Sequence, residues 1–273
     1  YTLSLHDALP ISATLAVTIQ KGGVGKTTTA INVAGALNQR GRDVLLVDLD
    51  PQGAATEGLG FAPEYDEKPP TLFDVLTDAE QRDALENIIV EHDEMDVVPS
   101  NIDMTAAEPE LTLSRRGGEQ LDLALDAVED DYDYVIIDCP PYLGYLTDNG
   151  LYAAQNVLIP ALAETTSKRA LELLFDHIES LELDYEISFE ERGLIANRVE
   201  ETNEAEEMME WFHDAFPDIP VWEIRKRVDL QRAFSNGCSI FEYKPDIDMA
   251  DRYLDIAASL DDQFDFDEPE ARQ

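Results

Sequence analysis

The sequence predicts an α/β fold: a single domain whose mainly parallel, twisted sheet carries helices on both faces. Three observations lead to this prediction. Short apolar runs alternate with helical patterns along the chain. The run at residues 44–47 is continuously apolar, as is typical of strands covered on both faces. A glycine-rich turn separates the first apolar run from the first helical pattern.

The elements follow in order. A first strand is predicted at residues 14–19, which are β-branched and apolar. A first helix is predicted at residues 26–40, where apolar residues recur at mostly helical spacing and Gly41 is a natural stop. Further strands are predicted at residues 44–47, 96–98, 134–137, 157–160, 194–196 and 219–221, and further helices at residues 119–128, 167–181 and 204–216. No internal repeat or long linker divides the chain.

Composition limits the class of protein. The 273 residues include 19 basic and 59 acidic side chains, a formal net charge of −40, and 44% are hydrophobic, which is enough for a core and excludes global disorder. No apolar run reaches the roughly 18 residues of a membrane span. The two cysteines, Cys139 and Cys238, cannot form a disulfide framework and fit a reducing cytoplasm.

The acidic charge is spread along the whole chain. Self-repulsion of this size destabilises a compact state at low salt, and screening relieves it. We therefore expect a surface adapted to molar salt, as in halophiles that accumulate KCl; the alternative is an ordinary acidic protein. The charge also argues against casual binding to nucleic acid or anionic lipid.

The two ends of the chain differ from its middle. Residues 1–12 lack an initiator Met and the basic start of a signal peptide, so we expect a non-native or disordered segment. Residues 13–260 are expected to form the domain. Residues 261–273 are expected to be a frayed acidic tail.

A phosphate-binding loop is predicted between the first strand and the first helix. It comprises Gly22, Gly23, Val24, Gly25, Lys26, Thr27 and Thr28. Glycines let backbone N–H groups point at phosphate oxygens, and the following helix offers its positive end. Lys26 would reach the β- and γ-phosphates of a nucleotide, and the Thr27 hydroxyl would bind Mg²⁺. Gln20 stands where the ordinary motif begins with glycine, and Lys21 follows it, so two of the six lysines of the chain lie in this loop or directly before it.

Together with residues 45–53, 134–141 and 157–160, this loop resembles the deviant P-loop ATPases of the ParA/Soj/MinD family, most closely the ParA/Soj branch. The match runs from about residue 13 to residue 260. The resemblance implies a P-loop NTPase fold and a cytoplasmic ATPase that binds ATP or ADP with Mg²⁺. It also implies an ATP-dependent homodimer that binds nonspecific DNA, partitions a chromosome or plasmid, and is stimulated by a ParB-like activator.

The resemblance also implies catalytic roles. Lys21 would reach across the dimer to the partner's nucleotide, where a cation stabilises charge on the transferring phosphoryl group. Asp50 would position or activate the attacking water. Asp48 would lie near the magnesium, and Asp138, in the Walker B position, would hold a magnesium-bound water or the Thr27 hydroxyl. Asp48 and Asp50 are two residues apart at a strand end, so we expect their side chains on one face.

Further residues are expected to contact the nucleotide base and DNA. By resemblance, Asn197 would hydrogen-bond the adenine, and Arg225 and Lys226 would lie over the base, although relatives have proline where this chain has Arg225. The best basic patch for DNA phosphates is Arg225, Lys226, Arg227 and Arg232; salt bridges to neighbouring carboxylates are the alternative.

Two residues near the end of the strand predicted at 134–137 need separate interpretations. Tyr142, in the switch II region, replaces a small residue of relatives and could alter a partner surface there. Cys139 beside Asp138 is expected to be a packed strand residue and not a redox or metal group.

A MinD-like ATPase acting on a membrane or protein partner is the alternative function, but the acidic C-terminal sequence lacks the basic amphipathic helix of a lipid anchor.

Overall fold

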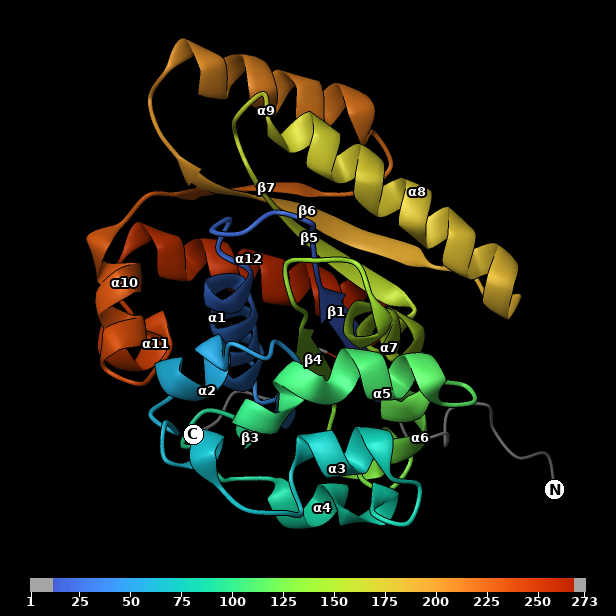
Figure 1. Ribbon diagram of the computed structural model, residues 1–273. Coiled ribbons are helices and arrows are strands. Elements are labelled where there is room, and N and C mark those ends of the chain that lie inside the picture. The colour runs from blue at the N-terminus through green and yellow to red at the C-terminus, as the bar shows by residue number, and fades with distance from the viewer. Residues whose placement is uncertain (1–11, 268–273) are drawn as a thin grey trace, which may run out of the picture.

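The computed structural model describes residues 12–267. At its centre lies a sheet of seven strands in the order β3-β2-β4-β1-β5-β6-β7, and every neighbouring pair is parallel (Figure 1). The strands are β1 (Ala13–Val17), β2 (Val44–Asp48), β3 (Asp96–Val98), β4 (Tyr134–Asp138), β5 (Asn156–Leu162), β6 (Glu190–Val199) and β7 (Val221–Arg225). The predicted single-domain α/β fold is confirmed.

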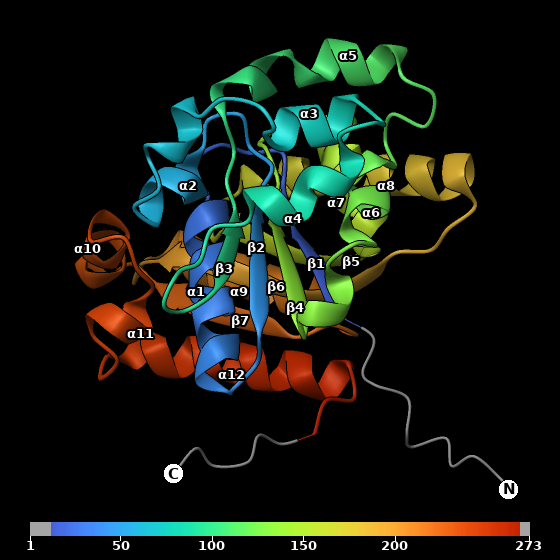
Figure 2. The same ribbon diagram turned by 90° about the horizontal axis from the view of Figure 1, so that it is seen from below.

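Helices cover both faces of the sheet, as predicted (Figures 1 and 2). They are α1 (Lys26–Gln39), α2 (Ala54–Gly58), α3 (Leu72–Thr77), α4 (Leu85–Ile88), α5 (Ala107–Leu113), α6 (Gln120–Leu125), α7 (Tyr145–Ala154), α8 (Ser167–Tyr185), α9 (Asn203–Ala215), α10 (Val228–Ser235), α11 (Ile240–Tyr243) and α12 (Asp248–Gln263). Helices α1 and α12 pack on one face, and α7 and α8 on the other. Within residues 12–267, no helix is long and apolar enough to cross a membrane.

The strands explain the continuous apolar runs of the sequence. Successive side chains of a strand point to opposite faces, so Leu45 and Val47 lie in one core and Val44 and Leu46 in the other. All four are buried, and each contributes roughly 1.5–3 kcal/mol by leaving water. The two cores fix the sheet between two helical layers, which sets the direction in which the strand ends point.

The last strand begins later than predicted. The sequence suggested residues 219–221, whereas β7 is Val221–Arg225. Pro220 has no N–H to donate to a ladder, and only its carbonyl takes part, accepting from the Leu194 amide at 2.9 Å. The pairing with β6 therefore continues beyond the predicted run.

The predicted frayed tail is wrong for residues 261–267. Helix α12 continues to Gln263, and Asp261 is 1% exposed. Its carboxylate accepts from the Nε atoms of Arg40 at 2.6 Å and Arg42 at 3.1 Å and from the Tyr134 hydroxyl at 3.0 Å. We call these four residues the C-terminal clamp. Asp261 is thus a buried ion partner and not a solvated charge. Residues 268–273, like residues 1–11 of the expected non-native segment, lie outside the described chain.

Candidate active site

The predicted site residues gather where strands β1, β2 and β4 end. These strands are adjacent and parallel, so their carboxyl ends meet at one edge of the sheet. Asp48 and Asp138 are direct register partners, each the last residue of its strand. Val17, the last residue of β1, pairs with Asp138 from the other side. The fold therefore brings the glycine-rich loop and two predicted carboxylates together.

The glycine-rich loop has the backbone geometry of an anion site. Gly23 and Gly25 have φ values of 74° and 90°, which favour glycine. Gly25 precedes α1, whose N-terminus has no side-chain cap, so its first N–H groups are available to an anion. A Cβ on Gly25 would lie 3.1 Å from the Asn197 amide nitrogen. Glycine is thus needed at this position for both conformation and space.

Asn197 braces this loop. Its Nδ2 donates to the Val24 carbonyl at 3.0 Å and to the Thr29 hydroxyl at 2.9 Å, and the residue is buried. The prediction placed Asn197 on an adenine base. In the structure its amide nitrogen is committed to the loop, a role that the sequence did not indicate because the partner residues lie about 170 positions away.

Lys26 lies buried among carboxylates at the start of α1. Burial lowers the pKa of its ammonium group, while the charges of Asp138 and Asp50 raise it. Its Nζ donates to the Lys21 carbonyl at 3.4 Å. A buried cation held at the mouth of an anion-binding loop is suited to phosphate oxygens.

Asp48 and Asp138 are buried carboxylates with unused oxygens. Asp48 Oδ2 accepts from the backbone and the hydroxyl of Thr56, both at 2.7 Å, but Oδ1 has no hydrogen-bond partner among residues 12–267. Neither oxygen of Asp138 has one at hydrogen-bond distance within the same range. Burial raises the pKa of Asp48 to about 7. Burial, aided by the charge of Asp48, raises the pKa of Asp138 well above its usual value, while Thr27 and Lys26 oppose this shift.

This donor set fits a divalent cation. Burying carboxylate oxygens without hydrogen-bond partners raises the free energy of the folded protein, and a bound cation would compensate their charge. The Thr27 side chain lowers the pKa of Asp138, and the charge of Asp48 raises it, so both groups lie close to the Asp138 carboxylate. Mg²⁺ prefers such oxygen ligands. Thr27, Asp48 and Asp138, the residues predicted to bind the metal, therefore gather around the Asp138 carboxylate.

Asp50 is held on both sides by residues that the sequence did not reveal. Its Oδ1 accepts from the Gln52 amide at 3.0 Å, and its carbonyl accepts from the Ser100 hydroxyl at 2.8 Å. The Tyr65 hydroxyl donates to the next carbonyl, that of Pro51, at 2.7 Å. Burial raises the pKa of Asp50, and the Gln52 amide and Lys26 oppose the shift. The segment that carries Asp50 is thus anchored from two distant loops.

Lys21 contacts the loop that follows β5 of its own chain. Its Nζ donates to the Thr166 hydroxyl at 2.6 Å and to Glu164 Oε2 at 3.2 Å. No local pattern identifies these partners, because they lie 143 and 145 residues away in sequence. The lysine predicted to act on a partner's nucleotide is therefore held in cis in the single chain.

The residues predicted for the base line one cavity beside the loop. Gly25 and Thr28 of the loop share it with Asn197, Arg225 and Lys226. The predicted positions are thus adjacent. Arg225 and Lys226, however, carry ion pairs of their own.

All four residues of the predicted DNA patch are paired with carboxylates. Arg225 contacts Glu223 at 2.9 Å, Lys226 contacts Glu200 at 2.7 Å, Arg227 contacts Asp248 at 2.5 Å, and Arg232 contacts Asp229 at 3.5 Å. The patch is therefore locally neutral. This arrangement corresponds to the salt-bridge alternative.

Glu108 fixes the chain after Asp138. Its carboxylate accepts from the amides of Tyr145 and Leu146, both at 3.0 Å, and so caps α7. Tyr142, in the loop between Asp138 and α7, is 39% exposed. Cys139 is fully buried, and burial raises the pKa of its thiol, so its expected packing role agrees with the structure.

Comparison with known proteins gives consistent matches. A family model described as an AAA domain matches residues 12–190. The sporulation initiation inhibitor protein Soj of Bacillus subtilis (strain 168) is 38% identical over 251 residues, 90% of this chain and 97% of that protein. The chromosome-partitioning ATPase Soj of Treponema pallidum (strain Nichols) is 33% identical over 249 residues, 90% of this chain and 96% of that protein.

A solved structure shares the fold. It is described as cobyrinic acid a,c-diamide synthase from Mycobacterium smegmatis with bound ADP and magnesium, and it is 32% identical with a TM-score of 0.76, covering 96% of this chain and 100% of that one. With the loop, the buried Lys26 and the strand-end carboxylates in place, the chain belongs to the AAA-domain family of P-loop ATPases that includes the Soj and ParA proteins.

Proposed function

We propose that this ATPase is an ATP-driven dimerisation switch for partitioning a chromosome or plasmid. The observation that carries the proposal is the convergence of Lys26 and three carboxylates beside a P-loop. Of these, Asp48 has one oxygen and Asp138 two without a hydrogen-bond partner among residues 12–267, and Asp50 is the third. These groups supply a cation for phosphate, oxygen donors for Mg²⁺ and a carboxylate for water in one place. The relative from Treponema pallidum carries the name of a chromosome-partitioning ATPase.

The loop amides and Lys26 bind and orient the β- and γ-phosphates of ATP. Thr27, Asp48 and Asp138 would hold Mg²⁺, which, when bound, would neutralise charge on the phosphates. Asp50 orients the attacking water by accepting its hydrogen bond at a carboxylate oxygen. Its anchors, Gln52 and Ser100, keep that oxygen in place.

Dimerisation adds Lys21 to this set. In the homodimer we propose, Lys21 leaves Glu164 and Thr166 and donates to the nucleotide of the partner. Turnover thereby depends on assembly, and release of phosphate removes the contacts that favour the closed dimer. A ParB-like activator would accelerate this cycle.

We propose that the ATP-bound dimer binds nonspecific DNA in the cytoplasm, at the nucleoid. Arg225, Lys226 and Arg232 keep about half or more of their side chains exposed and could exchange their carboxylate partners for phosphates. Ion pairs of this exposed kind are worth only about 0–1 kcal/mol, so the exchange is cheap. A MinD-like role on a membrane or protein partner is the alternative outcome.

The test uses the Asp50→Ala variant with ATP and Mg²⁺. We expect it to be trapped as a dimer by light scattering and to sediment with DNA across a KCl series. Replacing Arg225, Lys226 and Arg227 together with alanine should abolish sedimentation and leave the dimer intact. A monomer under all conditions would refute the dimerisation switch. A dimer that never binds DNA would refute only the proposed DNA binding and would favour another partner.

We also propose that the surface is adapted to high salt. With a net charge of −40, screening should favour the folded state. We expect the denaturation temperature, followed by circular dichroism without nucleotide, to rise as KCl increases from low to molar concentration. Maximal stability at low KCl would identify an ordinary acidic protein.

The amide-forming reaction named for the Mycobacterium smegmatis structure is not carried over. A cysteine that acts as a nucleophile must be accessible and must form its thiolate readily. Both cysteines are buried, and burial raises the pKa of the Cys238 thiol to about 11. Neither thiol has the exposure or the acidity of a nucleophile.

A further inference from the structure

Helix α2 carries a buried hydroxyl that connects two of the carboxylates at the strand ends. Thr56 is the third residue of this short helix and is fully buried. Its backbone nitrogen and its hydroxyl oxygen both lie 2.7 Å from Asp48 Oδ2. The amide nitrogen of Ser100 lies 2.8 Å from the same hydroxyl oxygen. Thr56 therefore joins the end of β2 to the segment that follows β3.

The direction of each hydrogen bond follows from the chemistry of the partners. A backbone amide can only donate, so the Thr56 hydroxyl oxygen accepts from Ser100. An ionised carboxylate can only accept, so the single hydroxyl proton is donated to Asp48. A β-branched side chain also has few accessible χ1 rotamers. The Thr56 side chain is thus held in one orientation.

These bonds determine which oxygen of Asp48 is available to a ligand. Oδ2 accepts from both donors of Thr56, whereas Oδ1 has no hydrogen-bond partner among residues 12–267. Hydrogen bonds to a carboxylate are among the stronger ones in proteins, so rotation of the carboxylate about χ2 would lose two strong bonds. Oδ1 is therefore the oxygen that remains for a cation, and the Thr56 hydroxyl helps to keep it so.

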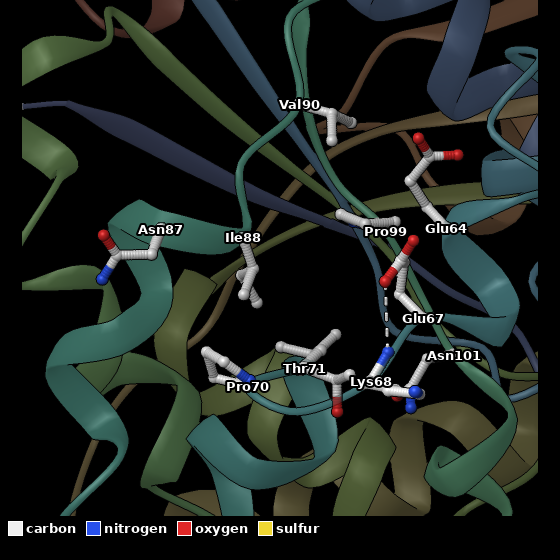
Figure 3. A pocket seen from close by; sticks show the side chains of 11 residues that line it. Glu64, Glu67, Lys68, Pro70, Thr71, Asn87, Ile88, Val90, Pro99 and Asn101 are labelled. Carbon is white, nitrogen blue, oxygen red and sulfur yellow. Dashed lines mark hydrogen bonds between the residues drawn. The ribbon is translucent and has the colours of Figure 1, made fainter.

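Ser100 extends the connection to Asp50. Its hydroxyl donates to the Asp50 carbonyl at 2.8 Å, while its amide is bound by Thr56. Its two neighbours, Pro99 and Asn101, line the cavity of about 340 Å³ shown in Figure 3, and Ser100 is not among the lining residues. A segment with open space on one side has fewer packing contacts there. Its distance from the site is therefore fixed mainly by the hydrogen bonds of Ser100.

Aromatic side chains hold α2 at both of its ends. A Cβ on Gly53, which precedes the helix, would lie 2.6 Å from the Tyr65 ring. A Cβ on Gly58, the last residue of the helix, would collide with the Phe234 ring of α10. So short a helix is not stable by itself, and its position comes from such packing. Thr56 is thus placed by the tertiary structure.

We propose that Thr56 is a positioning residue that fixes the Asp48 carboxylate and, through Ser100, the segment that carries Asp50 as a single unit. The oxygen for the metal and the carboxylate for the attacking water then keep one geometry. Because Thr56 is fully buried, it acts through these partners and not on the nucleotide. The consequence for turnover rests on the proposed function, whereas the consequence for the metal can be measured without turnover.

The metal site is tested on the full chain bound to ADP, with Mn²⁺ in place of Mg²⁺ and free Mn²⁺ measured by electron paramagnetic resonance. Thr56→Val removes the hydroxyl but keeps the backbone N–H and the shape of the side chain. We expect the Mn²⁺ affinity to fall about tenfold, as is common when a group that orients a metal ligand is lost. Thr56→Ser restores the hydroxyl and should restore the affinity. The affinity for a fluorescent ADP analogue in EDTA should not change in either variant, whereas general damage to the site would lower it.

Ser100→Ala separates the two ends of this series of hydrogen bonds. It keeps the amide that binds Thr56 and removes the hydroxyl that binds the Asp50 carbonyl. We expect unchanged Mn²⁺ affinity and a kcat for ATP about tenfold lower at nearly constant KM, measured by phosphate release at saturating Mg²⁺. Thr56→Val should lower both quantities. The control is Thr77→Val in α3, whose hydroxyl donates to the Phe73 carbonyl of its own helix at 2.7 Å; it should change neither.

Unchanged Mn²⁺ affinity in Thr56→Val would overturn the proposal, as would an equal loss in Thr56→Ser or Thr77→Val. If Ser100→Ala keeps the parental kcat, the connection to Asp50 is wrong. Circular dichroism checks folding, and Thr56→Ala replaces Thr56→Val in every measurement if valine prevents folding. If the parent chain binds ADP and Mn²⁺ but does not hydrolyse ATP, the proposed function fails, and the Mn²⁺ measurements still decide the role of Thr56.

Discussion

Buried carboxylates lie near both ends of strands β2 and β4, two of them in the strands and one in α12, and their hydrogen bonding differs between the two ends. At the carboxyl ends, Asp48 and Asp138 have oxygens without partners in the described chain. Near the amino ends, Asp261 is equally buried but is satisfied by Arg40, Arg42 and the Tyr134 hydroxyl.

The comparison separates structural charge from functional charge. A buried carboxylate with cations and a hydroxyl around it holds elements together, here α12 against the start of β4. A buried carboxylate with vacant oxygens weakens the unliganded protein and strengthens the liganded one. Burial alone does not distinguish the two; the inventory of hydrogen-bond partners does.

The largest expected effect is the loss of stability when Asp261 of the C-terminal clamp is replaced. Asp261→Ala leaves Arg40 and Arg42, which are 20% and 13% exposed at their side chains, without their buried counter-ion. We expect a loss of about 2–4 kcal/mol of unfolding free energy, measured by denaturant titration at fixed KCl. The exposed neighbour provides the control, since Asp262→Ala should stay within about 0.5 kcal/mol. If both variants lost the same unfolding free energy, the C-terminal clamp would not contribute specifically to the stability of the fold.

The second prediction concerns the other end of the same strand. Asp138→Asn should reduce turnover of ATP roughly 100-fold or more, since it removes an oxygen donor for Mg²⁺. It should also raise the unfolding free energy without nucleotide by about 1 kcal/mol, because it removes a buried charge next to Asp48. Turnover is measured by phosphate release, and stability by the same titration as for Asp261. A destabilisation like that of Asp261→Ala would make Asp138 a structural carboxylate.

The smallest expected effect tests a third, exposed carboxylate. The Lys21–Glu164 pair is 23% and 52% exposed, a kind of pair worth about 0.2–1 kcal/mol. Glu164→Gln should therefore lower the protein concentration needed for half-maximal turnover by up to about fivefold and leave stability unchanged. Lys21→Ala should lose turnover while still binding a fluorescent ATP analogue. Loss of that binding, or an unchanged concentration profile in Glu164→Gln, would contradict the release of Lys21 from its own chain.

The sequence predicted those parts of the fold that are encoded locally. The seven strands, the P-loop and the strand-end carboxylates each lie within a short run of residues. The supports of the site do not: Ser100 is 50 residues from Asp50, and Glu164 is 143 residues from Lys21. Only the folded chain brings such pairs together.

Charge obscured other features. Helix α12 buries Met249, Tyr253, Ile256 and Leu260 at helical spacing, but its many aspartates made its end resemble a frayed tail. For the patch of arginines and lysine at residues 225–232, the sequence left DNA binding and salt bridging open, because a list of cations does not reveal which carboxylates the fold places beside them. In so acidic a chain, the residue type alone does not predict whether a carboxylate or a cation is structural or functional.

The meeting of β1, β4 and α12 has a practical consequence for engineering. Ala13 pairs with Tyr134 in the sheet, and the Tyr134 hydroxyl donates to Asp261, so the first strand and the last helix come together at the amino ends of the strands. The P-loop lies at the opposite ends, one strand length or roughly 16 Å away. A short linker from the segment after α12 to the start of β1, in place of the residues outside 12–267, would therefore give a circular permutant, and a fluorescent reporter placed there would leave the nucleotide face open for imaging in living cells.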